Sequence, residues 1–483
     1  MLDKDLLSIQ EARALVRSAR EAQQAYAQLD QMRVDTIVKA IAVQAVAQAE
    51  ELAALAVEET GFGKVEDKKT KNILASEKLV DSIQGMKTMG VLNDDKVAKM
   101  VEVAVPMGVI AGIIPSTNPT STTIYKSIIA LKSGNAIVFT PHPSAQKCIG
   151  KTVDMIRSVL KSCGVSEDLV SVMHVPSLEG STELMKIVDL ILATGGPGMV
   201  KAAYSSGTPA LGVGAGNVPV FIERSADIDD AMDKILASKT FDNGTVCASE
   251  QAIVTEGIIA EQVKASLKAR GGYFLVGEDL AKVKAVMERP NGAMNPKIVG
   301  RDAQYIAKLA GIQVPAGTRL LVCEEEGVGP QYPFSKEKLT ALIGFYTVAD
   351  WQEACELCFA LLKNGGIGHS LAIHSSNEEV IREFGLKKPV SRMLVNTPST
   401  HGAVGISTNL FPSFTLGCGT VGGSATSDNV TPLHLMNIRR VAYDLGNMNF
   451  KGGASSTAPA ADTSSMDIEA LTGLILEELK KMA

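Results

Sequence analysis

The sequence predicts an α/β protein built on a parallel, doubly wound sheet. From residue 109 onward, short and fully apolar runs alternate with helical patterns, which is typical of buried parallel strands joined by crossover helices. The length of 483 residues suffices for roughly three domain-sized units, or two with appendages. A hydrophobic content of 46% with 21% charged residues suits a globular protein with sizeable cores.

Each expected element follows from local pattern. Residues 8–60 are rich in Ala, Gln and Glu at helical spacing and predict a helical layer. A second α/β unit is expected from Val218, and its strand at 251–255 directly follows the segment 241–250. The strands expected before it are 108–114, 135–139, 169–174 and 188–193, and the helices are 124–131 and 144–161. Residues 92–105 and the strand-like 438–443 are expected to form an arm between subunits.

Bulk properties exclude several classes of function. The net charge of −6, without a sustained basic run, makes a nucleic-acid partner unexpected. The longest apolar stretch, 103–115, is too short to span a bilayer and contains prolines. The chain opens directly into an amphipathic helical pattern, so no signal peptide is expected. The 7 cysteines are scattered and odd in number, which indicates reduced thiols in a cytoplasmic setting.

The C-terminal tail differs from the rest of the chain. Residues 451–465 are a flexible linker by composition. The helix expected after it, within 466–483, carries one apolar stripe formed by Ile468, Leu471, Ile475, Leu479 and Met482. An isolated helix of this length is marginal in water. The stripe therefore predicts either docking back onto its own domain or binding to another protein.

Cys247 is the strongest candidate for a nucleophile. It follows the turn-like run Asp242-Asn243-Gly244 and precedes an expected strand, so its thiol should be accessible at a loop edge. Many cysteines are simply packed as small hydrophobes, and these residues alone leave both interpretations open. No Lys, Arg or His lies close beside Cys247 in sequence, and burial would raise the pKa of its thiol.

A second candidate site follows the run 190–193. The segment from Thr194 to Pro197 reads as a strand end, a turn of Gly195 and Gly196, and a helix start. Glycines let the backbone approach a ligand, and a helix N-terminus offers free N–H groups to a phosphate or to the polar edge of a nicotinamide. An ordinary tight connection between a strand and a helix explains the same residues.

Two motifs are expected to carry no chemistry. The run 417–422 spells G-x-G-x-x-G, but turn residues follow where a helix should begin. Cys355 and Cys358 form a C-x-x-C inside a helical pattern at 351–363. Without a second ligand pair, the two thiols are expected to pack in the core, and no metal site is expected.

Four segments together carry a family resemblance: 114–120, 193–196, 212–219 and 243–247. In this order and spacing they resemble the aldehyde dehydrogenase superfamily over residues 8–447. More narrowly, they resemble the coenzyme A-acylating branch that handles acetaldehyde and propionaldehyde in bacterial microcompartments.

The resemblance implies a fold with three parts. They are a Rossmann-like NAD-binding domain (1–91 and 106–217), an α/β catalytic domain that carries Cys247 (218–410), and an oligomerisation arm (92–105 and 425–447). A dimer or tetramer is implied as well.

The resemblance also implies roles for individual residues. Cys247 would attack the aldehyde carbon, and the side-chain amide of Asn118, with the Cys247 backbone N–H, would hold the developing oxyanion. By its own sequence context, directly before Pro119, Asn118 would be a turn residue. Glu337 would bind the nicotinamide ribose. Because lysines flank it in the sequence, an exposed charge is the alternative interpretation of this residue. NAD would lie against residues from two strand ends: Thr140, Pro141, Thr194, Gly195 and Gly196.

One departure from the hydrolytic relatives predicts the product. Those enzymes carry a glutamate that activates water in the segment matching 212–217, and this run contains no carboxylate. A thioester on Cys247 should then persist until the thiol of coenzyme A accepts the acyl group. Thr140 stands where hydrolytic members have a lysine that contacts the adenosine ribose, so NAD rather than NADP is inferred only by resemblance.

Three alternatives stay open. The first is a hydrolytic aldehyde dehydrogenase, and the second is a non-catalytic cargo or scaffold protein on this fold. The presence of both Cys247 and Asn118 argues against the second. The third, the dehydrogenase half of a bifunctional aldehyde–alcohol enzyme, is disfavoured because the chain ends at Ala483. The tail helix is expected to be an encapsulation peptide for shell proteins, which implies a cytoplasmic enzyme inside a microcompartment.

Overall fold

The computed structural model describes residues 3–290 and 292–446. The predicted linker (451–465) and tail helix (466–483) lie outside the described residues. The chain divides into two compact units, residues 1–94 with 101–441 and residues 95–100 with 442–483. In the second unit, the backbone N–H of Tyr443 donates to the Lys99 carbonyl at 3.0 Å. The two large sheets and the candidate site belong to the first unit.

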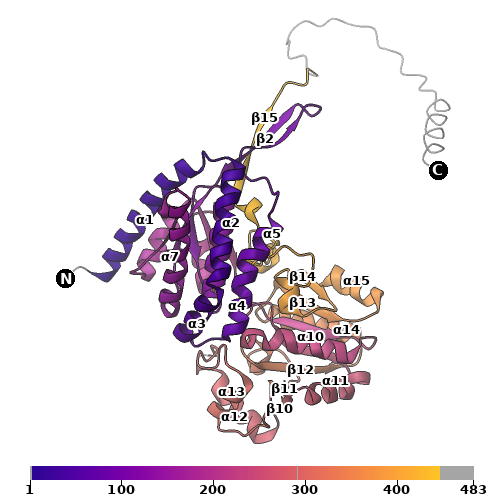
Figure 1. The fold of residues 1–483 in the computed structure, drawn as a ribbon. Helices are drawn as coiled ribbons and strands as arrows, with labels where there is room; N and C mark the ends of the chain where they lie inside the picture. The colour runs from indigo at the N-terminus through magenta and orange to yellow at the C-terminus, as the bar shows by residue number, and fades with distance from the viewer. Residues whose placement is uncertain (1–2, 291, 447–483) are drawn as a thin grey trace, which may run out of the picture. The chain divides into compact units, whose positions relative to one another are not determined.

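The predicted N-terminal helical layer is confirmed. Asp3 and Asp30 cap the first two helices, because their side chains accept hydrogen bonds from the N–H groups of Asp5 and Arg33. Figure 1 shows α2, α3 and α4 as the indigo helices beside the first sheet. The bounds are α1 Lys4–Tyr26, α2 Gln31–Ala47, α3 Ala49–Thr60, α4 Val65–Ile73, a π turn at Leu74–Lys78 and α5 Leu79–Ser82.

The first large sheet is parallel and doubly wound, as predicted. Its order is β5-β4-β3-β6-β7, so the chain winds outward from β3 and then returns to begin again on its other side. That reversal leaves a crevice at the carboxyl ends of β3 and β6, where such sheets bind ligands. The strands are β3 Val109–Ile113, β4 Ala136–Thr140, β5 Val170–Val172, β6 Leu190–Thr194 and β7 Ala210–Val213.

Helices cover this sheet, and its strands are accordingly almost wholly buried. The covering helices are α6 Pro119–Lys132, α7 Gln146–Ser162, α8 Leu178–Ile187 and α9 Pro197–Tyr204. Helix α6 begins at Pro119 rather than at the predicted residue 124. Proline suits the first helical position because its fixed φ is already helical and its missing N–H would have had no partner. Asn118 is consequently the residue that precedes the helix.

The second large sheet has seven parallel strands in the order β10-β11-β12-β9-β8-β13-β14. Side chains alternate between its faces: Val220 and Ile222 of β8 pack in one apolar cluster, and Phe221 packs in another. Helices α10 and α11 supply the first cluster, and α14 and α15 supply the second. The strands are β8 Val218–Ile222, β9 Glu250–Glu256, β10 Gly272–Phe274, β11 Leu320–Glu324, β12 Leu342–Val348, β13 Gly368–His374 and β14 Val390–Val395. The helices are α10 Ile228–Thr240, α11 Gly257–Ala269, α12 Gly277–Met287, α13 Ala303–Ala310, α14 Trp351–Lys363, α15 Glu378–Lys387 and α16 Ser399–Ala403.

The two motifs expected to carry no chemistry agree with the structure. Cys355 and Cys358 are buried free thiols in α14. Within the run 417–422, the only helical element is the short 3-10 turn Thr420–Gly422, so no helix follows to bind a dinucleotide. The segments predicted to form an arm contain β1 Val91–Asp95, β2 Met100–Pro106 and β15 Met436–Ala442, which form one sheet in the order β1-β2-β15. Their role between subunits stays a prediction.

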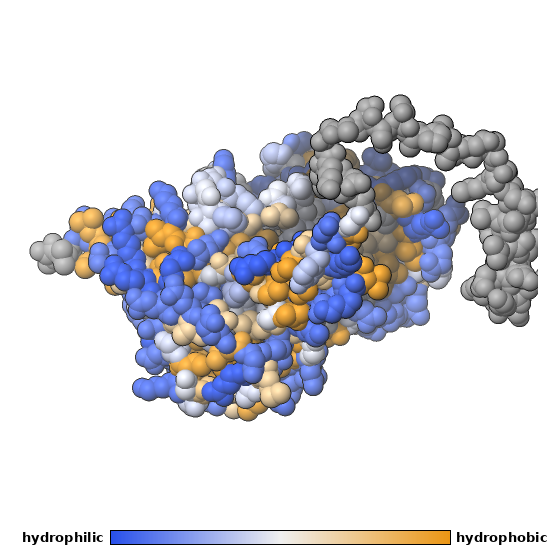
Figure 2. All heavy atoms as spheres, turned by 90° about the horizontal axis from the view of Figure 1, so that it is seen from above, coloured by the Kyte–Doolittle hydropathy of each residue, from blue (hydrophilic) through white to orange (hydrophobic). Residues whose placement is uncertain are grey.

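On the face shown in Figure 2, hydrophobic side chains lie in several patches among hydrophilic ones. No single helix of the described residues is long and apolar enough to cross a membrane. The bent pair α2 and α3, with 63° between its helices, meets the criteria of length and composition only when the two are joined.

Candidate active site

A cavity of about 490 Å³ opens at the carboxyl ends of β3, β4 and β6. This is the crevice expected where a doubly wound sheet reverses its strand order. The cavity is lined by all eight residues singled out in the sequence: Asn118, Thr140, Pro141, Thr194, Gly195, Gly196, Cys247 and Glu337. The described residues contain no cluster of three or more His, Cys, Asp or Glu that could hold a metal ion.

One end of the cavity has the features of a nucleotide site. Thr140 ends β4 and Thr194 ends β6, so the two flank β3 at the reversal point. Gly196 precedes α9, and a side chain at this position would meet no atom within 4 Å. The helix N-terminus thus faces open space, which suits a phosphate or a carboxamide. The Thr140 hydroxyl lies 2.8 Å from that of Ser181.

The loop that carries Cys247 turns sharply. Asp242, Asn243 and Gly244 all have positive φ, at 50°, 52° and 78°, although Asp and Asn adopt this region far less readily than Gly. The Asn243 side chain donates to the Gly300 carbonyl at 2.9 Å and helps to hold this conformation. The loop thereby leaves α10, exposes Cys247 to the cavity and enters β9 within a few residues.

Cys247 is partly buried at the cavity wall. Burial, followed by the nearby Glu337 carboxylate, raises the pKa of the thiol to about 12, and Arg392 opposes this only weakly. The expectation that burial raises the pKa of this thiol therefore holds. At neutral pH the Cys247 thiol is protonated in the free protein.

Asn118 has one orientation of its carboxamide. Its Oδ1 accepts a hydrogen bond of 2.7 Å from Nζ of Lys71. An ammonium can only donate, so the oxygen must face the lysine. The Asn118 amino group is left as the donor for the cavity, with one weak contact of 3.3 Å to the Thr117 hydroxyl.

Glu337 lies at the cavity wall and not on an exposed, lysine-rich surface. Its Oε1 accepts a hydrogen bond of 3.0 Å from the backbone N–H of Gly216. Burial raises the pKa of the carboxyl to about 7, although the Gly216 N–H, Lys239 and Lys338 act in the opposite direction. The protonated and ionised forms of the Glu337 carboxyl are therefore both populated near neutral pH.

Gly216 connects Glu337 with Cys247, and sequence reasoning missed this connection. A Cβ atom on Gly216 would lie 2.0 Å from the carbonyl oxygen of Cys247. The run 212–217 contains no carboxylate of its own, as noted in the sequence, but the fold brings the carboxylate of Glu337 against it. A carboxylate from a different segment therefore lies beside this run. Residues 121 positions apart give no local signal of such a contact.

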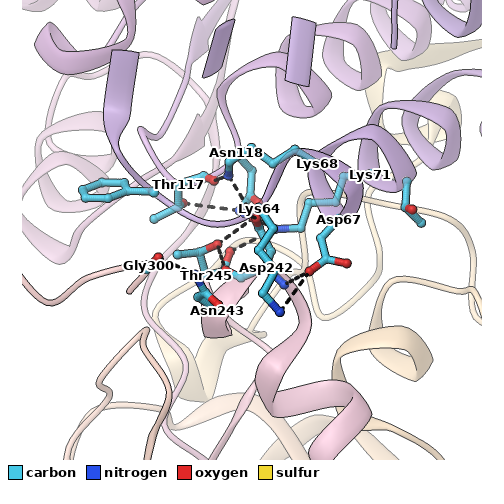
Figure 3. A network of polar contacts seen from close by, with 12 residues as sticks. Lys64, Asp67, Lys68, Lys71, Thr117, Asn118, Asp242, Asn243, Thr245 and Gly300 are labelled. Atoms are coloured by element: carbon cyan, nitrogen blue, oxygen red, sulfur yellow. Dashed lines mark hydrogen bonds and ion pairs between the residues drawn. The ribbon is translucent and has the colours of Figure 1, made fainter. Parts of the chain in front are cut away.

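A buried ionic cluster beside Asn118 was missed as well. Lys68 and Lys71 of α4 both contact Oδ2 of Asp242, Lys68 at 2.8 Å. Figure 3 shows the two lysines and Asn118 around this carboxylate. In the sequence, Lys68 and Lys71 look like the exposed charges of an ordinary surface helix.

His369 is a further residue without a signal in the sequence. It is fully buried, its Nε2 has no hydrogen-bond partner among the residues that the structure describes, and its ring approaches Gly216. Burial and the nearby Arg392 lower the pKa of the imidazole to about 3. The ring is therefore neutral at physiological pH.

Comparisons with known proteins agree with this geometry. The model of the aldehyde dehydrogenase family matches residues 6–327. The chain is 44% identical over 448 residues to the bifunctional aldehyde-alcohol dehydrogenase of Escherichia coli strain K12, with 91% of this chain and 50% of that protein covered. The chain thus spans about half the length of that relative.

Solved structures are similar over almost the whole chain. An acetylating aldehyde dehydrogenase from Geobacillus thermoglucosidasius is 48% identical with a TM-score of 0.91, covering 93% of this chain and 100% of that one. A propionaldehyde dehydrogenase from a Clostridium phytofermentans fucose utilisation microcompartment is 30% identical with a TM-score of 0.82, covering 89% and 97%. Propionaldehyde dehydrogenase of Rhodopseudomonas palustris, solved with bound CoA and an acylated cysteine, is 28% identical with a TM-score of 0.80, covering 89% and 97%.

Proposed function

This chain belongs to the aldehyde dehydrogenase family, and from that premise we propose that it is a CoA-acylating aldehyde dehydrogenase. It converts a short aliphatic aldehyde, propionaldehyde or acetaldehyde, with NAD+ and CoA to acyl-CoA and NADH. The observation that carries the proposal is that Cys247, Asn118 and the turn Thr194–Gly196 line one cavity.

The first step forms a covalent bond to Cys247. The Cys247 thiol first releases its proton to solvent, and the thiolate then adds to the aldehyde carbon and produces a thiohemiacetal with its oxygen as the anion. The oxygen gains negative charge as the bond forms, and the Asn118 amino group and the Cys247 backbone N–H donate to it. Loss of one such donor typically slows catalysis by about 10²–10³-fold. The orientation of Asn118 toward the cavity, imposed by Lys71, supports this role.

Residues at the other end of the cavity suit a nicotinamide cofactor. Thr140, Pro141 and the turn Thr194–Gly196 would hold it, and the open space over Gly196 is consistent with close approach of a ligand to the backbone. Bound there, the cofactor supplies the hydride acceptor needed for oxidation to a thioester. Glu337 would bind the nicotinamide ribose, and NAD is the preferred form in this proposal.

Transfer of the acyl group to CoA completes the reaction. The sulfur of CoA attacks the thioester carbon, the Cys247 sulfur leaves, and the products are acyl-CoA and the free thiol. The CoA-bound, cysteine-acylated structure of the R. palustris relative supports this route. So does the absence of any carboxylate within the run 212–217.

One observation favours a second candidate function, hydrolysis of the thioester to a carboxylic acid. Glu337 shares the cavity with Cys247, and its pKa of about 7 suits a general base at neutral pH. The carboxylate is nevertheless engaged by the Gly216 N–H. We therefore favour acyl transfer to CoA over hydrolysis.

A product assay separates the two functions. NADH, acyl-CoA and free acid should be measured against short aliphatic aldehydes, with and without CoA, using NAD+ and NADP+ in parallel. Acylation predicts that multiple turnovers require CoA and that acyl-CoA equals NADH. Free acid formed at a comparable rate without CoA would support hydrolysis. A Cys247→Ala protein that still made acyl-CoA would contradict the role of Cys247, and a wild-type protein that made neither NADH nor acyl-CoA would favour the non-catalytic scaffold.

We also propose that the enzyme works inside a bacterial microcompartment, in the cytoplasm, with residues 466–483 binding shell proteins. The similarity to a microcompartment propionaldehyde dehydrogenase supports this location. Residues 451–483 should be fused to a fluorescent reporter in cells that form shells. Co-localisation with the shells is expected, and a reporter that stays diffuse would contradict targeting.

Assembly into a dimer or tetramer through the arm completes the proposal. The side chains of β15 are exposed beyond its first residue, including those of Ile438 and Val441. Exposed apolar side chains on a strand are typical of surfaces that pair with another chain. Sedimentation analysis of the intact protein and of an Ile438→Lys variant tests this: the variant should dissociate.

A further inference from the structure

Helix α4 presents two buried lysines to a single carboxylate. The side chains of Lys68 and Lys71 are 2% and 3% exposed, and that of Asp242 is 0% exposed. Both ammonium groups contact the same Asp242 oxygen. The three side chains together carry one positive charge in excess when the lysines are protonated, and a buried charge is costly unless polar groups surround it.

Oxygen atoms of the active site accept hydrogen bonds from the two ammonium groups and so stabilise the excess positive charge. Lys71 donates to Oδ1 of Asn118 at 2.7 Å and to the Thr245 carbonyl at 3.4 Å. Lys68 donates to the Thr117 carbonyl at 2.8 Å. These acceptors lie on two separate segments, one leading into α6 and the other leading to Cys247. The cluster therefore joins the two segments that supply the oxyanion donors.

We propose that Lys71 is a positioning residue for the reaction, which holds the Asn118 carboxamide with its amino group toward the substrate oxygen and in register with the Cys247 loop. This inference rests on the proposed function. The two ends of a carboxamide have nearly the same shape, so packing alone would not prevent Asn118 from turning over. Turned over, its Oδ1 would face the oxyanion and repel it.

The charge on Lys71 contributes to this role. Burial lowers the pKa of Lys71 to about 8, although Asp242 acts strongly in the opposite direction and Lys68 adds to the lowering. At neutral pH the ammonium is therefore mostly protonated. Asp67 and His401 are the other titratable groups that face it.

Asp242 does not depend on Lys71 for its hydrogen bonds. Its Oδ1 accepts from the backbone N–H of Lys64 at 2.8 Å, and its Oδ2 accepts from the Thr245 hydroxyl at 2.7 Å and from Lys68. Figure 3 shows these contacts converging on the carboxylate. A Lys71→Met variant leaves a fully bonded Asp242 with one counter-charge, so it should fold.

The test is a double-mutant cycle of Lys71→Met and Asn118→Ala, with Lys69→Met as the control. Lys69 lies on the same helix but is exposed and pairs with Glu50. We expect Lys71→Met to lower the single-turnover rate of NADH formation by about 10–100-fold, less than the roughly 10²–10³-fold for complete loss of a donor. The KM for aldehyde should change little. Lys71→Arg, which keeps a cationic donor, should recover part of the rate.

Two results distinguish positioning from general damage. The double variant should be no slower than Asn118→Ala, because Lys71 acts through Asn118. Alkylation of Cys247 by iodoacetamide, which needs no oxyanion donor, should be unchanged in Lys71→Met. Multiplicative rate losses, or an unchanged rate in Lys71→Met, would overturn the inference. Failure of wild type and Lys69→Met to make acyl-CoA would instead overturn the proposed function.

Discussion

The carboxylate of Glu337 is hydrogen-bonded to the backbone of Gly216, with 3.0 Å between Oε1 and the amide nitrogen. Gly216 in turn lies against the Cys247 carbonyl, where a Cβ atom would be only 2.0 Å away. The carboxylate and the nucleophile are therefore fixed on either side of one peptide. Because like charges repel, the carboxylate raises the pKa of the Cys247 thiol. A substitution at Glu337 therefore tests both the binding of NAD and the reactivity of the Cys247 thiol.

Glu337→Gln should have two separate effects. The amide oxygen can still accept the Gly216 hydrogen bond, but the negative charge is gone. Loss of the charge in the proposed contact to the nicotinamide ribose should raise the KM for NAD about tenfold or more. The pKa of Cys247 should fall, so alkylation by iodoacetamide at pH 8 should be faster than in wild type. Glu324→Gln, at an exposed ion pair with Lys264, is the matched control.

The same variant separates the two candidate functions. Under acyl transfer to CoA, Glu337→Gln should leave the ratio of acyl-CoA to NADH at one. If hydrolysis were the activity, acid production without CoA would collapse in this variant, since the only proposed base would be lost. Slower alkylation of Cys247 would contradict the electrostatic argument.

Gly216→Ala should damage the site, and Gly214→Ala should not. The new methyl group at Gly216 would overlap the Cys247 carbonyl and crowd His369, at 2.0 and 3.2 Å. Overpacking of this kind typically costs about 1–3 kcal/mol of unfolding free energy, and it must move either Glu337 or the nucleophile. At Gly214 a methyl group meets nothing within 4 Å. The temperature of thermal unfolding should fall for the first variant only, and an equal fall in the two variants would refute the argument.

The alkaline pH dependence should change in Lys71→Arg. The pKa of Lys71 is lowered to about 8 by burial, so its charge is lost as pH rises from 7 to 9, whereas arginine stays protonated. Ionisation of Cys247 affects both proteins alike and cancels in their ratio. The ratio of the variant's single-turnover rate to that of wild type should therefore rise with pH, by up to about tenfold at pH 9. A constant ratio would mean that the charge on Lys71 does not matter.

Patterns within a few residues predicted most of the fold. The strands β3, β4 and β6 could be recognised because each is a short apolar run ended by Gly, Pro or Thr, and buried parallel strands have this composition. The start of α6 at Pro119 was not predicted because Asn118, directly before it, has the context of a turn residue. A proline after a polar residue is typical both of turns and of helix starts, so the local sequence does not separate them.

Only the site residues that stand in recognisable sequence motifs were predicted. Cys247 and Asn118 stand in recognisable segments, and the fold brings both to the cavity. The contact from Lys71 to Asp242 spans 171 positions, and nothing in the sequence distinguishes Lys71 from an exposed helix lysine. The role inferred for Lys71 follows from the burial of its side chain and from the charges of the groups around it. Both depend on the fold.

Asn118→Asp should lower activity while raising stability. The new carboxylate keeps the bond to Lys71 and supplies a second anion in direct contact with this lysine, beside Asp242, a gain on the order of 1 kcal/mol or more. It also turns an oxygen toward the oxyanion, so NADH formation should fall at least as far as in Asn118→Ala. Asn243→Asp is the contrasting control, because Asn243 donates to the Gly300 carbonyl and a carboxylate there would face another oxygen. The temperature of thermal unfolding should therefore rise for the first variant and fall for the second. A downward shift in both would show that the cluster has no excess positive charge to neutralise, and the electrostatic account of Lys71 would fail with it.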